Sequence, residues 1–249
     1  MSSNLIIIKC ISIIFLFESV LAQNFDTSFI QKCSRSDSKL NACLKQSFNG
    51  LKPYLISGIP EIGLPPMEPL RIDAMGIENN SGNIRIKGVF TNVVNSGASN
   101  FTVKEVRSDI NKFRLDLGIF IPNIKSRGRY EVNGQVLLLP ILSHGEFIAE
   151  FNDINAIAKI YGKPVTKSNE EYMMIDKMVV DFVMKSARFK VKDQGHQQLN
   201  EVINQFLNQN AHELVQEMRQ PASQSLAKVF KKFLDIAFAN VPLRVWLTE

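Results

Sequence analysis

The sequence has 249 residues, of which 45% are hydrophobic and 21% are charged, and its formal net charge is +5. Its apolar content is sufficient for the core of one large domain or two small ones. A basic chain can bind nucleic acid or an anionic membrane. The basic residues here are scattered, with no run longer than Lys231-Lys232, which favours an ordinary solvated basic surface.

Residues 1–22 have the features of a secretory signal peptide. An apolar run from Leu5 to Phe17 is followed by Val20-Leu21-Ala22, which has small or branched residues where a signal peptidase cleaves. The alternative is a membrane anchor, but this run is shorter than the roughly 20 residues that cross a bilayer. We therefore expect a secreted chain of about 227 residues, 23–249, with no integral membrane segment.

Cys33 and Cys43 are the two cysteines that remain after this cleavage, because Cys10 is removed. In an oxidising compartment they are expected to form one disulfide. The alternative is a pair of buried free thiols. Two cysteines with no nearby histidine cannot complete a tetrahedral metal site, so no metal is expected.

The first part of the mature chain is predicted to be helical and is followed by a proline-rich connector. Apolar residues recur at helical spacing up to Ser57. The connector Gly58–Leu70, GIPEIGLPPMEPL, contains four prolines, which exclude a helix or a central strand and predict an extended segment.

Residues 71–192 alternate between apolar and charged side chains, which is typical of strands with one buried face. In the segment 112–121, Phe113, Leu117 and Ile121 lie on one predicted face, opposite Arg114 and Asp116. Turn signals such as Asn133-Gly134 separate several runs of this kind. The pattern predicts an antiparallel sheet with one wet face and one apolar face that must be covered.

The carboxyl-terminal region supplies that cover. Apolar residues follow a helical period from Leu199 onward, and polar residues, including Asn200, Asn204 and Asn208, fill the opposite face. Pro221 is expected to kink or interrupt this helix. If it were continuous over 196–240, the helix would be about 65 Å long.

The order of these parts resembles the takeout and haemolymph juvenile-hormone-binding protein family of insects. The connector GIPEIGLPPMEPL and the helix segment FLNQN carry the resemblance most specifically, and it covers essentially the whole mature chain. It implies a secreted α+β protein in which a long C-terminal helix is wrapped by a highly curved antiparallel sheet. It also implies a tubular hydrophobic tunnel and a disulfide that ties down the first helix.

The resemblance further implies a monomeric carrier, in haemolymph or a similar fluid, for a small elongated hydrophobic ligand. A terpenoid similar to juvenile hormone, a fatty acid or another lipid would fit, with no cofactor and no nucleic acid. The apolar side chains predicted to face the interior are the candidates for the tunnel lining: Phe113, Leu117, Val136, Met174, Met178, Phe182, Phe206 and Met218.

The sequence departs from the family pattern in two places. Ser143-His144-Gly145-Glu146-Phe147 lacks the first glycine of a G-x-G-x-F turn, and residues 191–195 replace a common L-F-N-G segment. No cysteines are present for the second disulfide of the hormone-carrying branch. The chain is therefore more similar to the takeout branch. Members of the family as a whole are linked to hormone transport, feeding, circadian output and chemosensory behaviour, so the resemblance leaves the process open.

Two sequons, at Asn79 and Asn100, predict N-glycosylation of a secreted chain.

An enzyme is not expected. The sequence contains no G-x-S-x-G pentapeptide, and the pair His212-Glu213 lacks the second histidine of a zinc-protease helix. The remaining alternative is a secreted interaction or signalling protein whose core is filled by side chains and which acts through its surface.

Overall fold

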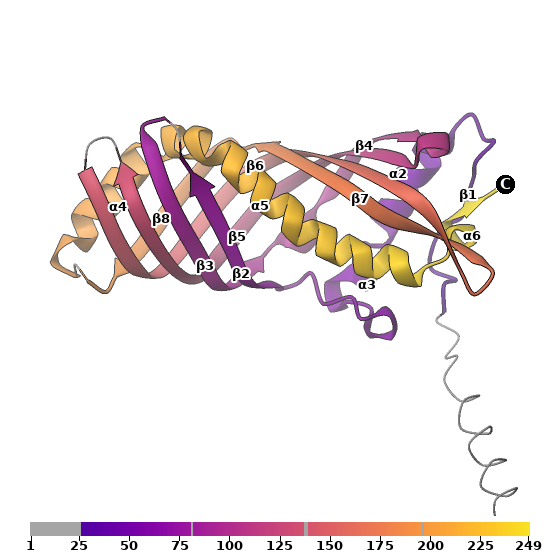
Figure 1. Cartoon of the computed structure of the whole chain (residues 1–249), viewed down its shortest axis with the longest axis horizontal. Helices are drawn as coiled ribbons and strands as arrows, with labels where there is room; N and C mark the ends of the chain where they lie inside the picture. The colour runs from indigo at the N-terminus through magenta and orange to yellow at the C-terminus, as the bar shows by residue number, and fades with distance from the viewer. Residues whose placement is uncertain (1–25, 81, 137–138, 196) are drawn as a thin grey trace, which may run out of the picture.

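The computed structural model describes residues 26–80, 82–136, 139–195 and 197–249, so the predicted signal peptide lies outside the described residues. Figure 1 shows an elongated molecule in which a curved sheet is accompanied along its length by helix α5, Ala211–Asn240. This is the expected α+β arrangement of a long C-terminal helix held by a curled antiparallel sheet. Within the described ranges, none of the helices combines the length and the apolar character needed to cross a bilayer.

Two very long strands form the centre of the sheet. β5 and β6 pair in antiparallel register along most of their lengths, and the strand order is β2-β3-β5-β6-β7, with β4 added to β5 and β8 added to β6. The alternation predicted for 112–121 is confirmed from Arg114 onward, where β5 begins and where Leu115 and Leu117 are buried. The strands of this sheet are β2 Leu70–Asn79, β3 Ile84–Ser96, β4 Thr102–Asp109, β5 Arg114–Val136, β6 Leu139–Lys167, β7 Glu170–Val183 and β8 Ser186–Asp193.

The first and last strands meet at one end of the sheet (Figure 1). Strand β1, Cys33–Ser34, pairs in parallel with β9, Leu247–Thr248, and the short helix α6, Leu243–Trp246, leads into β9. Helices α2, Leu40–Gly50, and α3, Lys52–Ser57, lie beside them, as the helical spacing predicted. A disulfide joins Cys33 to Cys43 and so links α2 to the strand pair. We call this region the disulfide end.

Replacing both cysteines with serine is expected to lower the free energy of unfolding by about 2–3 kcal/mol, because the 11-residue loop is no longer closed in the unfolded chain. The loss should be local first, because the disulfide connects α2 to β1 and not to the long strands. Circular dichroism should show near-UV changes at a denaturant concentration where the far-UV signal of the sheet is still intact. A single transition shared by both signals would contradict this expectation.

The connector Gly58–Leu70 is not extended, which corrects the prediction. It contains a 3-10 turn, η1 Pro60–Ile62, and its chain folds back so that Ile59 and Leu64 exchange two backbone hydrogen bonds. Gly58 and Gly63 both have positive φ angles, which side chains rarely adopt, so glycine permits the reversal. The prolines exclude regular structure but not a compact turn.

The C-terminal helix is interrupted at Asn210 and not at Pro221. α5 continues through Pro221, whereas the helical segment ends at Asn210, between α4, Asn200–Gln209, and α5. The Asn210 side chain donates a hydrogen bond to the Phe206 carbonyl at 2.8 Å. The break allows α4 to follow strand β8 while α5 takes a different direction across the sheet (Figure 1).

Part of the polar face of α4 is bonded to the free edge of β8, although Glu201, Gln205 and Asn208 stay exposed. Three asparagines, which we call the asparagine ladder, bond to the backbone of alternate β8 residues. The pairs are Asn208 with Phe189, Asn204 with Val191 and Asn200 with Asp193, and each asparagine both accepts from the N–H and donates to the C=O. Four helical residues rise about 6.0 Å and two strand residues about 6.7 Å, so this spacing matches. The ladder covers an edge that would otherwise be open to pairing.

Candidate functional site

Helix α5 closes the open side of the curved sheet. It packs against β7 and β8 on one side and against β2 on the other. Arg219 donates to Asp181 of β7, with Nε 2.7 Å from Oδ1, and the Ser225 hydroxyl donates to the Gly76 carbonyl of β2. The hydrogen bond from Arg219 holds the pKa of the Asp181 carboxyl below its usual value. The sheet and α5 together therefore enclose an elongated interior.

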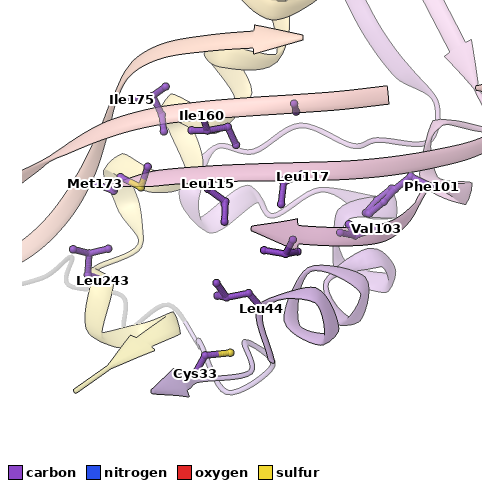
Figure 2. Packing of buried hydrophobic residues seen from close by; sticks show 12 residues of the cluster. Cys33, Leu44, Phe101, Val103, Leu115, Leu117, Ile160, Met173, Ile175 and Leu243 are labelled. Atoms are coloured by element: carbon purple, nitrogen blue, oxygen red, sulfur yellow. The ribbon is translucent and has the colours of Figure 1, made fainter. Parts of the chain in front are cut away.

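The interior is filled with side chains at the disulfide end. Figure 2 shows Leu44 of α2, Val103 of β4 and Leu243 of α6 converging on strands β5 to β7. Leu44, Ile160 and Leu243 are each about 1% exposed. This half of the molecule is a packed core.

The other half of the interior is lined by aromatic side chains that remain half-exposed. They are Phe90, Phe147, Phe151 and Phe189, from β3, β6 and β8. Phe147 lies between the buried residues Gly145 and Ala149, which shows that it faces inward. The four rings form two edge-to-face pairs, Phe90 with Phe147 at 5.4 Å and Phe151 with Phe189 at 6.0 Å between centroids. An inward apolar side chain that stays accessible is not fully covered by protein atoms, so this aromatic wall can contact another apolar group.

A buried polar group lies beside the aromatic wall. Asp193 is fully buried at the end of β8, and its carboxylate accepts hydrogen bonds from the Ser143 hydroxyl and from Tyr130, whose oxygen is 3.4 Å away. Burial, and secondarily the nearby Asp193 charge, raises the pKa of the Tyr130 hydroxyl. These contacts fix β8 to β5 and β6.

Gly145 explains one part of the family-like turn. A Cβ on Gly145 would lie 2.0 Å from the Lys192 carbonyl oxygen, so only glycine allows β8 to approach β6 here. Gly145 and the segment 191–195 were recognisable in the sequence as motif positions, but the Asp193 hydrogen bonds were not. A carboxylate two positions after the last apolar residue of the strand, Val191, gives no local signal of burial.

The candidate lining residues fall into three groups. Leu117 is buried in the core of the disulfide end, and Phe113 and Met178 pack against it. Phe113 has a φ of 48° and precedes β5 rather than lying within it. Phe182, Val136 and Met218 are half-buried on β7, β5 and α5. The last two candidates, considered next, are exposed.

Met174 faces outward, which corrects its predicted position. Its neighbours Met173 and Ile175 are buried, whereas Met174 is 43% exposed. The pairing of β7 with β6 skips Asp176, an extra residue that shifts the alternation by one position. From Met178 onward the predicted face is correct again.

Phe206 is also largely outside the interior, at 40% exposure. The asparagine ladder holds the asparagine face of α4 against β8. Phe206 and its helical neighbours Leu199 and Val202 lie on the other face and are exposed. The helical period correctly separated the two faces of α4 but did not show which one the sheet would contact.

The two sequons have different surroundings. Asn79 is buried and its amide nitrogen donates to the Ile84 carbonyl at 2.7 Å, whereas Asn100 is exposed at the end of η2, Ala98–Asn100.

We expect glycan on Asn100 and not on Asn79, because a glycan is attached to the amide nitrogen that Asn79 uses in its buried hydrogen bond. In protein secreted from cultured insect cells, enzymatic deglycosylation should lower the mass of the wild type. It should leave the mass of Asn100→Gln unchanged. Asn79→Gln is the matched control and should show the same decrease in mass on deglycosylation as the wild type. The reverse pattern would show that a glycan is attached to Asn79 before the β2–β3 turn forms.

The surface of the described part of the chain has depressions, and two of them are well formed. One, of about 510 Å³, is lined by polar residues of β2 and α5, including Glu78 and Glu217. The other, of about 590 Å³, lies beside Arg129, His144 and Gln194. Neither is lined by the candidate residues.

Comparisons with known proteins agree with one another. Residues 10–248 match the sequence profile of the family described as haemolymph juvenile hormone binding protein (JHBP). The chain is 26% identical over 224 residues to the circadian clock-controlled protein daywake of Drosophila melanogaster, covering 86% of this chain and 85% of that protein. It is 26% identical over 195 residues to daywake of Drosophila yakuba, covering 74% and 75%.

Among solved structures, the chain is similar to Takeout 1 of Epiphyas postvittana. The TM-score is 0.75 at 21% sequence identity, with 88% of this chain and 100% of that chain covered. At this identity the similarity shows the fold, a curled antiparallel half-barrel with a long helix.

Proposed function

Because this chain belongs to the haemolymph juvenile hormone binding protein family of insects, whose members are lipid-binding carriers, we propose that it carries an elongated apolar ligand between α5 and the sheet. The observation that supports this most directly is the half-exposed aromatic wall of Phe90, Phe147, Phe151 and Phe189. A hydrocarbon laid along these rings would remove its own surface and theirs from water.

The expected affinity is substantial. Burial stabilises by about 25 cal/mol per Å², so a fully enclosed C15 to C20 chain contributes on the order of 8–12 kcal/mol before the entropic penalty of association. A juvenile-hormone-like terpenoid, a fatty acid or another lipid fits this description. The filled core at the disulfide end would limit how far such a chain extends.

The proposal includes a cellular setting. Residues 1–22 would direct secretion and 23–249 would form one binding domain, present as a monomer in haemolymph or a similar fluid and without enzymatic activity. The relatives in Drosophila are named as clock-controlled, and by extension the abundance of this chain would vary over the day. Sampling its transcript through a light and dark cycle tests that extension.

Native mass spectrometry of the secreted protein, followed by organic extraction, tests the carrier function. We expect a stoichiometric apolar molecule of roughly 15 to 50 carbons, the size range that burial on this scale can hold. A protein that is empty and also fails to take up a fluorescent fatty acid would overturn the proposal. The alternative, an interaction protein acting through its surface, would then stand.

A further inference from the structure

The outer face of the sheet gathers basic side chains that are scattered in the sequence. Three neighbouring strands, β5, β6 and β8, each present three outward residues in register. The rows across the strands are Lys125, Glu150 and Arg188; then Arg127, Ile148 and Lys190; then Arg129, Glu146 and Lys192. We call these nine residues the basic grid. All are exposed except Glu150, which is half-buried.

The basic grid carries a high density of positive charge. Adjacent strands lie about 4.8 Å apart and alternate residues about 6.7 Å apart, so the nine positions span an area of roughly 10 by 14 Å. Six are basic and two are acidic, a net of four positive charges out of +5 for the whole chain. Both acidic residues lie on the central strand β6, where Glu150 is 3.7 Å from the Lys125 ammonium, and all grid positions on β5 and β8 are basic. A surface of this kind attracts an extended anionic partner.

Aliphatic side chains in and beside the grid indicate what kind of anion it fits. Ile148, at its centre, is 54% exposed, and Leu142, further along the same face of β6, is 66% exposed. Nucleic acids and sulfated polysaccharides offer little for isolated aliphatic side chains. An anionic bilayer offers phosphate groups to the cations and an apolar interfacial layer to Ile148 and Leu142.

The position of the grid relative to the interior is also informative. Strand alternation places Phe147 and Phe151 of β6 and Phe189 of β8 on the inner surface of the same strands. The basic grid and most of the aromatic wall therefore lie on opposite surfaces of the same strands.

We propose that the basic grid is a docking surface for anionic lipid membranes, with the Lys and Arg side chains at the phosphate layer and Ile148 in the interface. The surface would bring the wall of the interior next to a bilayer. It depends only on surface residues and does not require that the interior bind a ligand.

Vesicle flotation with the full mature protein tests the proposal. Wild-type protein should float with vesicles containing about one-third phosphatidylserine and remain unbound with pure phosphatidylcholine. The triple variant Arg127→Ser, Arg129→Ser, Lys190→Ser should bind the anionic vesicles at least about tenfold more weakly, since each basic residue near such a surface strengthens binding several-fold. Ile148→Ser should weaken binding about fivefold through lost apolar burial.

The matched control removes the same charge elsewhere. Lys163, Lys167 and Lys177 are exposed on β6 and β7 away from the grid, and their triple substitution with serine should change vesicle binding less than about twofold. Because every substituted side chain is exposed, all variants should melt as the wild type does and retain any ligand detected by native mass spectrometry.

Several outcomes would overturn the proposal. One is wild-type protein that stays unbound with anionic vesicles. Another is an equal loss of binding in the two triple variants, which would show that only net charge matters. Displacement from vesicles by heparin, together with no effect of Ile148→Ser, would instead identify a soluble polyanion as the partner of this face. None of these results would bear on ligand binding in the interior.

Discussion

Replacing Phe147 with glutamate is expected to abolish retention of an apolar ligand, whereas replacing the next residue, Ile148, with glutamate should leave retention intact. The two side chains project from opposite faces of β6. Phe147 is part of the aromatic wall, edge-to-face with Phe90, and Ile148 is exposed on the outer face. The two substitutions therefore introduce the same charge and differ only in the face of the sheet on which that charge is placed.

The physical reason is desolvation. An apolar ligand lying on the wall would strip water from a carboxylate at position 147 and offer it no hydrogen-bond donor, which costs several kcal/mol and corresponds to at least about a hundredfold loss of affinity. A carboxylate at position 148 stays in water. It should instead weaken binding to anionic vesicles, since it neutralises part of the basic grid.

Native mass spectrometry of both variants, with uptake of a fluorescent fatty acid as a second measurement, provides the check. Thermal melts identify how much of each preparation is folded, and Phe147→Ser, which introduces no charge, should retain part of the uptake. Equal retention by the glutamate variants at positions 147 and 148 would show that the wall does not contact ligand.

Replacing Asn204 with leucine is expected to detach the middle of α4 from β8. The Asn204 side chain accepts from the Val191 N–H at 2.7 Å and donates to the Val191 carbonyl at 2.9 Å, and leucine can do neither. Two backbone groups of a half-buried strand would lose their partners, which we expect to lower the free energy of unfolding by about 2 kcal/mol.

Hydrogen exchange measures the loss of the α4–β8 contact at single backbone amides. The Val191 amide should exchange at least about tenfold faster in the variant, because its protection would then depend on local opening of α4 rather than on global unfolding. Gln205→Leu, at the neighbouring exposed position, is the control and should leave Val191 protected. Asn204→Asp keeps an acceptor for the N–H but loses the donor, so its effect should lie between the two. An unchanged Val191 exchange rate in Asn204→Leu would show that the ladder does not hold this edge.

The asparagine ladder also shows why a resemblance can locate a segment without explaining it. The FLNQN segment was one of the two most family-like parts of the sequence, and it contains Asn208, the last residue of the ladder, and Asn210, where α4 ends. On a helical projection the asparagines form an ordinary polar face, and polar faces usually contact water. Only the position of β8 shows that their spacing of four residues matches alternate residues of a strand edge.

The features that could be predicted from the amino-acid sequence are those that depend on residues close together in the chain. Alternation identified the strands and the inward side of Leu115 and Leu117, helical spacing identified α2 and the C-terminal helices, and the family resemblance supplied the α+β architecture. Tertiary structure alone decided the features that depend on register between distant segments. The skipped residue Asp176 reversed the direction of Met174, and pairing across β5, β6 and β8 brought basic residues that never form a run in the sequence into one grid. Periodicity specifies which residues share a face of one element, but which face is covered, and by what, follows from how the elements pack.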